Sequence, residues 1–357
     1  YGKYWYRSGI NTSMTRELED IATSAIQSIP TQHGDNFLDI ACNDGTLLKF
    51  VPSEKFFKVG IDPCDDSFAR EARKNADVVE QDFFSAESYW KVCSNKAKIV
   101  TAIAMFYDLD DPKSFLNDIN EVMDDEGLLV LQLSYTPLML KQMAFDNICH
   151  EHICFYSLTS LKYILDRCDM NIVDCVFNDV NGGSFRIYIR KKDATTELFK
   201  TAPYRDVANF RIDSILEYEK KLKLNDPETY KVFFKRITQL KNLTITFINK
   251  EKEKGKTIWG YGASTKGNTL LQWYGLDNTM IDGIAERNPD KYNHKTVGTN
   301  IPIFSEEDMR KANPDYLLIL PWHFIHEFKE REKEFLKNGG KFIVPCPNFE
   351  IIGGDDQ

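Results

Sequence analysis

Two stretches in which an apolar strand runs into a loop of small residues constrain the fold of this chain most strongly. Residues 37–45 read FLDIACNDG and residues 258–267 read IWGYGASTKG. Small residues at such a turn let backbone N–H groups approach a ligand at the start of the following helix. Each stretch therefore predicts an open, mostly parallel sheet with its ligand at the carboxyl edge. A length of 357 residues is sufficient for two such units.

Apolar runs and helical periodicity after the first loop continue the alternation of strand and helix. We expect a first helix over 15–29, strands at 37–40, 58–61, 76–79, 99–103 and 128–133, and helices from 46 and over 114–123. A helix over 158–167 and strands at 171–176 and 185–189 follow, and the composition of 181–184, Asn-Gly-Gly-Ser, favours a hairpin turn between these strands.

The second half of the chain repeats the pattern on a smaller scale. We expect strands at 257–259, 281–285, 316–320 and 341–344, with a helix over 268–273. The highly charged residues 193–254 show helical spacing and are interpreted as a solvated pair of linker helices. The predicted organisation is an N-terminal aromatic segment and helix (1–30), a first α/β domain (31–192), a helical linker (193–254) and a Rossmann-like domain (255–357).

Composition excludes several classes of protein. A net charge of −9 argues against a general nucleic-acid binder, which would carry basic stripes. The sequence has no run of about 18 or more apolar residues, so we expect no membrane span. Its eight cysteines form no C-x-x-C pair and are typical of free thiols in a reducing cytosol, which predicts a cytoplasmic protein. Oligomeric state is open between monomer and homodimer.

Acidic residues lie at or just after the ends of the first three predicted strands, at the edge where the ligand is expected. Asp39 precedes the first loop, Asp62 ends the second strand, and Asp82 with Phe83 follows the third. An acid at the tip of the second strand is placed to bind ribose hydroxyls, and Asp82–Phe83 to hold an adenine. Because the first loop has no G-x-G-x-x-G, the cationic cofactor S-adenosylmethionine is favoured over NAD. The remaining candidate cofactor residues lie in the loops after strands one and four: Ala41, Asn43, Gly45 and Ala104.

A concentrated set of ionisable residues, His150-Glu151-His152, lies between the two strand–loop–helix stretches. An isolated His-x-His is more often a polar loop, so the neighbouring motifs must support a catalytic interpretation. Cys149 and Cys154 flank the histidines, but without a second ligand cluster they are a weak metal signature, and no metal is expected.

Candidate substrate residues are found in the hairpin turn and in the second loop. Asn181 and Ser184 are candidate substrate residues, and an outward-facing Arg186 is expected to meet an anionic ligand. The residues around the second loop form a plausible diphosphate cradle, with Glu286 at the end of the next strand placed to bind ribose. Two further candidates are Asn268, at the start of the following helix, and His323, which is expected to face an interdomain cleft. The full set in this half of the chain is Tyr261, Ser264, Lys266, Asn268, Glu286 and His323.

Taken together, these motifs resemble the nucleotide-sugar C-methyltransferases of bacterial deoxysugar pathways. The resemblance rests on five stretches in the family's order: 6–9 (YRSG) with Asn11, Ser13 and Met14, 39–46 (DIACNDGT), 150–152 (HEH) with Tyr156 and Ser157, 181–186 (NGGSFR) and 260–267 (GYGASTKG). It implies a class I S-adenosylmethionine domain, a doubly wound sheet, followed by a smaller Rossmann-like domain, with the keto-sugar nucleotide between them. It also implies that His152 is the general base and Glu151 its neighbour.

This sequence departs from the family's pattern in two places. Typical members begin with a four-cysteine zinc domain; either it precedes Tyr1 in a longer chain or this branch lacks it. Several members have a tyrosine directly before HEH, where this chain has Cys149, which leaves the sugar and the methylated atom open.

The implied reaction is coherent in chemical terms. A neutral imidazole at His152 removes the proton next to a ketone, and hydrogen-bond donors stabilise the enolate, for which Tyr6, His150 and Asn181 are candidates. The enolate then attacks the sulfonium methyl, without a metal. The alternatives are a sugar O-methyltransferase that uses the same base, a non-catalytic ligand-binding homologue, and NAD-dependent chemistry.

Overall fold

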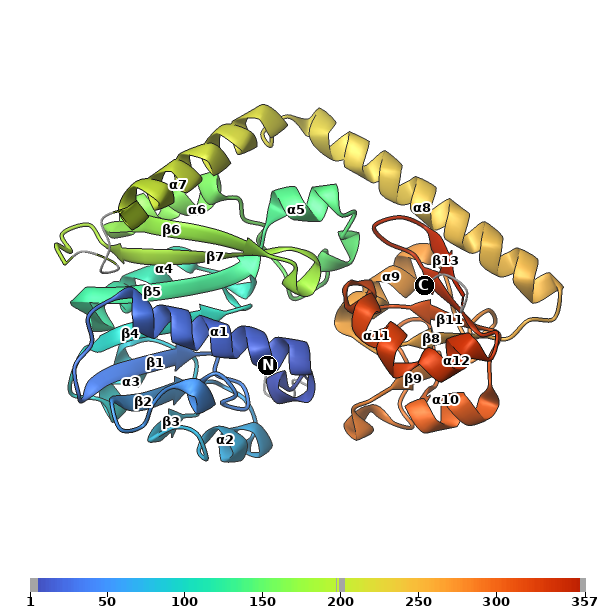
Figure 1. Cartoon of the computed structure of the whole chain (residues 1–357), viewed down its shortest axis with the longest axis horizontal. Coiled ribbons are helices and arrows are strands. Elements are labelled where there is room, and N and C mark those ends of the chain that lie inside the picture. Colours follow the sequence, from blue (N-terminus) through green and yellow to red (C-terminus); the bar gives the residue numbers. More distant parts are fainter. Residues whose placement is uncertain (1–5, 197, 199–202, 354–357) are drawn as a thin grey trace. The chain divides into compact units, whose positions relative to one another are not determined.

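The structure, a computed structural model, describes residues 6–196, 198 and 203–353 and divides into two compact units (Figure 1). The first unit comprises residues 1–135 and 153–222, and the second comprises 136–152 and 223–357. No helix among the described residues is both long enough and apolar enough to cross a membrane.

The first unit is built on a seven-stranded sheet in the order β3-β2-β1-β4-β5-β7-β6, an order that can be followed in Figure 1. β7 pairs antiparallel with both neighbours, and the other pairs are parallel. The strands are β1 (Asp35–Ile40), β2 (Phe56–Ile61), β3 (Val78–Glu80), β4 (Ala97–Ile103), β5 (Met123–Ser134), β6 (Met170–Asn178) and β7 (Ser184–Lys191). This confirms the predicted class I methyltransferase fold and the hairpin at residues 181–184.

Helices of the first unit bury apolar faces that the sequence periodicity predicted. Leu18, Ile21 and Ala25 of α1 are buried with β1 and β5 residues in one core. The helices are α1 (Thr12–Ser28), α2 (Asp66–Ala72), α3 (Ala86–Val92), α4 (Pro112–Val122), α6 (Leu158–Leu165) and α7 (Pro203–Leu222). One prediction was wrong: no α-helix begins at Thr46, and a 3-10 helix, Leu48–Phe50, stands there. With Pro52 so close, this segment is too short to sustain a helix.

The second unit has a six-stranded sheet in the order β10-β9-β8-β11-β12-β13, parallel except for the pair β12–β13. Its strands are β8 (Ile258–Tyr261), β9 (Ile284–Glu286), β10 (Ile303–Ser305), β11 (Tyr316–Ile319), β12 (Lys341–Val344) and β13 (Glu350–Ile352). Its helices are α5 (Thr136–Lys141), α8 (Pro227–Glu253), α9 (Thr265–Tyr274), α10 (Glu306–Ala312), α11 (Ile325–Arg331) and α12 (Lys333–Lys337). The order turns around β8, which places the loop before α9 at a topological switch point.

Segment 136–152, which the sequence analysis counted with the first α/β domain, packs in the second unit. Met139, Met143 and Phe145 are buried in that unit's core. The Phe145 ring stacks on the ring of Tyr274 in α9, with centroids 5.6 Å apart. The sequence alone could not assign segment 136–152 to the second unit, because only tertiary packing decides which hydrophobic core its apolar residues join. The HEH stretch thus belongs to the second unit up to His152.

The charged residues 193–254 also differ from the solvated linker that was predicted. α8 buries Phe233, Ile237 and Ile248 in the core of the second unit. In α7, Glu219 is only 3% exposed and its carboxylate accepts hydrogen bonds from the Tyr135 hydroxyl, 2.7 Å, and from the backbone N–H of Leu158, 2.6 Å. Each helix is therefore a packed part of one unit.

Candidate active site

The loop after β1 has the tight conformation that its small residues predicted. Ala41, Asn43 and Gly45 have positive φ angles of 57°, 52° and 73°. The backbone N–H of Asn43 donates to Asp62 Oδ2, 2.7 Å, and that of Cys64 donates to Asp62 Oδ1, 2.9 Å. Asp62 therefore joins the loops after β1 and β2 and holds its carboxylate at the carboxyl edge of the sheet, 8% exposed.

Asp39 is the second carboxylate of this loop and is almost fully buried, at 4% exposure. The Thr101 hydroxyl donates to Asp39 Oδ1 at 2.7 Å. Burial raises the pKa of Asp39 to about 7, an effect that the Thr101 hydrogen bond opposes and the Asp62 charge strengthens. A positively charged ligand would favour the ionised form of this carboxyl.

The N-terminal aromatic segment is attached to the same loop. The Asn43 side chain donates to the backbone oxygen of Tyr6, 2.9 Å, and accepts from the N–H of Ser8, 3.1 Å. The N–H of Gly9 donates to Asp44 Oδ2, 2.9 Å. Tyr6 as a whole is 38% exposed, but desolvation around its hydroxyl, followed by the Asp44 charge, raises the pKa of that group, so the phenol remains a proton-bearing donor. Tyr4 and Trp5 lie outside the described residues.

A pocket at the carboxyl ends of β4 and β5 brings together two candidates that are distant in sequence, Ala104 and Ser184. It is lined by Met14, Ile103, Ala104, Tyr107, Gln132, Leu133, Ser134 and Ser184. The N–H groups of Ile153 and Cys154 donate to the Tyr107 backbone oxygen, at 3.1 and 3.0 Å. These hydrogen bonds attach residues 153 and 154 to Tyr107, which lines this pocket.

Two further candidates of the first unit, Asp82 and Phe83, lie next to each other after β3. Asp82 accepts from the N–H of Phe83 at 2.8 Å, and the Phe83 ring is 63% exposed, which leaves its face open for stacking. The side chain of Asn181 lies outside what the structure describes.

Arg186 is buried rather than outward-facing, so that prediction was wrong. Its side chain is 4% exposed, and its guanidinium donates to Glu17 and Asp20, 2.8 Å each, and to Gln132, 3.0 Å. β7 is an interior strand, and the polar face of α1 supplies the carboxylates that neutralise the arginine. Arg186 fastens α1 to the sheet.

S-adenosylmethionine, the cofactor that the resemblance implies, fits the donor set of the first unit. Its ammonium and sulfonium groups are cationic, and Asp39 and Asp62 supply carboxylates at the carboxyl edge. The positive φ angles of Ala41, Asn43 and Ala104 turn the loops on either side of the β1–β4 switch point. An exposed aromatic ring, Phe83, is available for the adenine.

In the second unit, the HEH loop fixes the orientation of His152. Its ring Nδ1 lies 2.9 Å from the Asn147 backbone oxygen. The backbone N–H of His152 donates to the Cys149 backbone oxygen at 3.2 Å. Because a carbonyl oxygen can only accept, the proton of the neutral ring is on Nδ1 and the lone pair is on Nε2. Burial, and then the Lys266 charge, lowers the pKa of His152 to about 4, so the imidazole is neutral at physiological pH.

Lys266 and Asp146 form the electrostatic centre of the same region. Asp146 is 1% exposed, and its Oδ2 accepts from the indole N–H of Trp322 at 3.1 Å. Burial raises the pKa of Asp146 and lowers that of Lys266, while the attraction between their charges opposes both shifts. The lysine also lowers the pKa of the neighbouring His323 well below its usual value, after burial as the main cause. Lys266 thus lies beside the HEH loop.

The remaining candidates of the second unit divide into loop residues and a core residue. The Ser264 hydroxyl caps α9 by accepting from the Gly267 N–H, 3.0 Å, and Glu286 accepts from the Ala263 N–H, 2.8 Å. Asn268 Oδ1 is buried with no hydrogen-bond partner among the described residues. Tyr261 was predicted to contact substrate, but it is 2% exposed and donates into the Glu306–Glu332 pair, because its side chain points from a central strand into the core.

Sequence reasoning missed Asp146, Trp322 and Thr101. An acid directly after the apolar run Met143 to Phe145 was a signal that could have marked Asp146, since a buried carboxylate needs a partner. No sequence signal paired it with Trp322, because the two residues are far apart along the chain.

The comparisons with known proteins cover both halves of the chain. A family described as "Methyltransferase domain" matches residues 7–174, and one described as "C-methyltransferase C-terminal domain" matches residues 179–347. The C-methyltransferase NovU of Streptomyces niveus is 27% identical over 99% of this chain and 82% of its own length.

Two solved methyltransferase structures match half of this chain. Mitomycin 7-O-methyltransferase MmcR is 14% identical, with a TM-score of 0.39 over 50% of this chain and 54% of its own. A methyltransferase from Clostridium acetobutylicum is 13% identical, with a TM-score of 0.39 over 50% of this chain and 92% of its own. These scores are too low to carry an argument, and the order of the seven-stranded sheet is what supports the methyltransferase fold.

Proposed function

We propose that this chain is an S-adenosylmethionine-dependent C-methyltransferase that methylates a carbon next to the ketone of a nucleotide-linked keto-sugar, which its matches to methyltransferase families and to NovU support. The observation that carries the proposal is the orientation of His152. Its Nδ1 faces the Asn147 carbonyl at 2.9 Å, which leaves the Nε2 lone pair as the proton acceptor. A base of this kind serves an acidified C–H, and the methyl group comes from the cofactor.

In the proposed reaction, His152 takes the proton from the carbon next to the ketone and an enolate forms. The electrons of the C–H bond move into the enolate, whose carbon then attacks the methyl carbon of the sulfonium. The carbon–sulfur bond breaks, its electrons return to sulfur, and S-adenosylhomocysteine leaves. Tyr6, whose hydroxyl keeps its proton, is the candidate donor to the enolate oxygen. The low pKa of His152 keeps the base unprotonated before each turnover.

The nucleotide part of the substrate is assigned to the second unit. α9 begins at Thr265, and its first-turn N–H groups provide an anion site for the diphosphate. Glu286 lies at the end of β9, as Asp62 lies at the end of β2. Glu286 accepts a hydrogen bond from the Ala263 N–H, in the loop after β8, at 2.8 Å. Asp62 likewise accepts from the Asn43 N–H, in the loop after β1, at 2.7 Å. Glu286 is therefore the proposed ribose ligand, as Asp62 is for the cofactor.

Turnover of a panel of nucleoside diphosphate keto-hexoses with S-adenosylmethionine tests the proposal. We expect one added methyl group on carbon, read by mass spectrometry and carbon NMR. His152→Gln should lower kcat by about 10²-fold or more, the range for a general base. The exposed His326→Gln, also in the second unit, is the matched control and should retain wild-type turnover. A methyl ether product, or full activity of His152→Gln, would overturn the assignment.

A further inference from the structure

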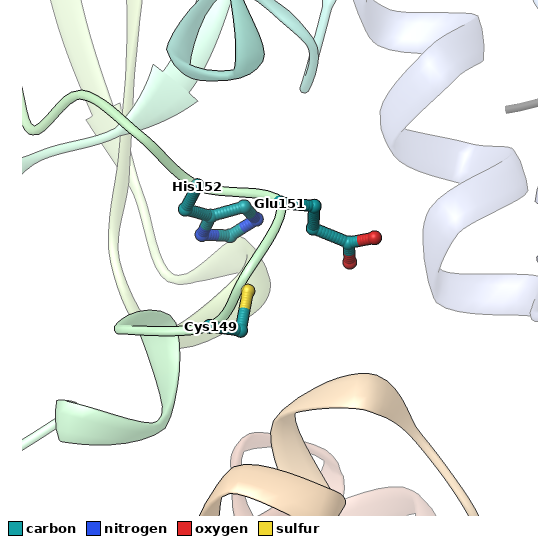
Figure 2. A group of neighbouring side chains, drawn as sticks. All are labelled: Cys149, Glu151 and His152. Atoms are coloured by element: carbon teal, nitrogen blue, oxygen red, sulfur yellow. The ribbon is translucent and has the colours of Figure 1, made fainter.

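The HEH loop gathers three different metal-ligating side chains. Among the residues that the structure describes, Cys149, Glu151 and His152 offer a thiol sulfur, a carboxylate oxygen and a ring nitrogen that all lie within 4.8 Å of one another. Figure 2 shows the Cys149 sulfur directed toward the His152 ring, while the Glu151 side chain extends away from the ring. All three side chains are partly exposed, so an ion can reach them from solvent.

The three donors match the chemistry of Zn²⁺. Thiolate, imidazole and carboxylate are its usual protein ligands, and three of them leave a fourth position for water. A tetrahedral site with bonds of about 2.0–2.3 Å separates its donor atoms by roughly 3.3–3.8 Å. The three donor atoms lie within 4.8 Å of one another, so binding would draw them closer together by movement of the side chains and the loop. A thiolate and a carboxylate together neutralise the two charges of the ion.

The surroundings of His152 are those of a metal-bound histidine. Metal-ligating imidazoles usually donate their other N–H to a backbone carbonyl or carboxylate, which fixes the ring. Here the Asn147 carbonyl oxygen accepts from the ring at 2.9 Å. The backbone N–H of His152 also donates to the Cys149 backbone oxygen at 3.2 Å, so the loop already holds its turn without an ion.

We propose that Cys149, Glu151 and His152 form a Zn²⁺-binding site whose occupation inhibits the enzyme. Binding replaces the thiol proton of Cys149 by the metal and releases that proton to solvent. An Nε2 lone pair bound to zinc cannot accept a proton from substrate, so metal and catalysis exclude each other. Zinc binding at this site does not depend on the proposed function. The inhibition does rest on that function, because it requires His152 to be the general base.

The positive charge of Lys266 should repel a metal ion bound at this site, so a variant without that charge tests the proposal. The lysine acts electrostatically on both Cys149 and His152, and Asp146 offsets part of its charge. Removing the ammonium with Lys266→Met should tighten metal binding by about tenfold, which corresponds to about 1.4 kcal/mol. A structural role of Lys266 alone would not produce tighter binding.

The test is a titration of the whole protein with Co²⁺, a spectroscopic substitute for Zn²⁺. We expect near-ultraviolet sulfur-to-cobalt charge transfer and the intense visible bands of four-coordinate cobalt, both removed by one equivalent of Zn²⁺. Cys149→Ser should abolish the charge transfer and weaken Zn²⁺ binding at least about tenfold. Cys154→Ser, the matched control from the same stretch, should keep both. Unchanged bands in Cys149→Ser, or only the weak bands of six-coordinate cobalt in the wild type, would overturn the site.

The inhibition is measured separately, by methyl transfer with and without Zn²⁺. Wild-type activity should fall with zinc and return with a chelator, whereas Cys149→Ser should remain active at the same zinc concentration. Equal zinc sensitivity of the two proteins would refute the inhibition. If no keto-sugar is turned over, the proposed function fails, but the cobalt spectra still decide whether the metal site exists.

Discussion

Asp39 offers the sharpest prediction about the energetics of the fold. Its carboxyl is buried in β1 and hydrogen-bonded by Thr101 at 2.7 Å, and its pKa is raised to about 7. The cause is burial, so ionising this group costs folded-state stability. Asp39→Asn keeps an oxygen that can accept from Thr101 and removes the charge. We therefore expect Asp39→Asn to be more stable than the wild type at neutral and higher pH.

The magnitude and its pH window follow from the shift. Relative to an unfolded pKa of about 3.9, the rise to about 7 corresponds to roughly 4 kcal/mol, at 1.36 kcal/mol per pKa unit. A raised carboxyl pKa means that the unfolded state loses its proton first. Wild-type stability therefore falls as pH rises from about 4 to about 7 and is level above that. The advantage of Asp39→Asn should be about 1.5 kcal/mol at pH 5 and up to about 4 kcal/mol at pH 8.

Urea unfolding at several pH values measures this difference. The exposed Asp110→Asn is the control and should follow the wild type. Titration calorimetry adds a second readout, because the cationic cofactor should favour the ionised carboxylate. Asp39→Asn should bind S-adenosylmethionine about tenfold more weakly, the loss of one charge-assisted contact. A stability difference that is constant from pH 5 to pH 8 would show that Asp39 titrates normally and would refute the reasoning.

Two further predictions concern contacts that hold each unit. Glu219→Gln should lower the unfolding free energy by about 2 kcal/mol in urea titrations, because its NH2 group would face either the Leu158 or the Thr159 N–H, now 2.6 and 2.8 Å from separate carboxylate oxygens. An unchanged midpoint would contradict this. Gly262→Ala should cost about 1–3 kcal/mol in thermal unfolding of the second unit, because φ is 87° and the new Cβ would lie 2.6 Å from Pro321 Cγ. Gly255→Ala, with φ 75° but open space, is the comparison and should cost less.

The strand–loop–helix stretches made most of the fold predictable. Period and turn chemistry are local properties, so β1, β2, β4 and β5 could be placed within a few residues, and Asp62 at the carboxyl edge followed from them. The conformations of Ala41 and Asn43 agreed with the expectation of a tight loop.

What could not be predicted depended on contacts between distant parts of the chain. The packing of 136–152 in the second unit rests on Phe145 against Tyr274 and on Asp146 against Trp322, pairs that no local pattern signals. Arg186 and Tyr261 were taken for ligand residues because their motifs are polar. The structure shows that carboxylates of α1 and α10 engage them instead. Polar residues in a motif can serve the motif's framework as well as its ligand.

The central claim is that His152 abstracts a proton from carbon. The most direct measurement is deuterium wash-in at the carbon next to the ketone, with enzyme, keto-sugar nucleotide and S-adenosylhomocysteine in D₂O, followed by NMR. Exchange without methyl transfer should occur with the wild type and His326→Gln, and should be lost with His152→Gln. Exchange that survives in His152→Gln, or a wild-type enzyme that methylates the sugar without exchanging this hydrogen, would contradict the account.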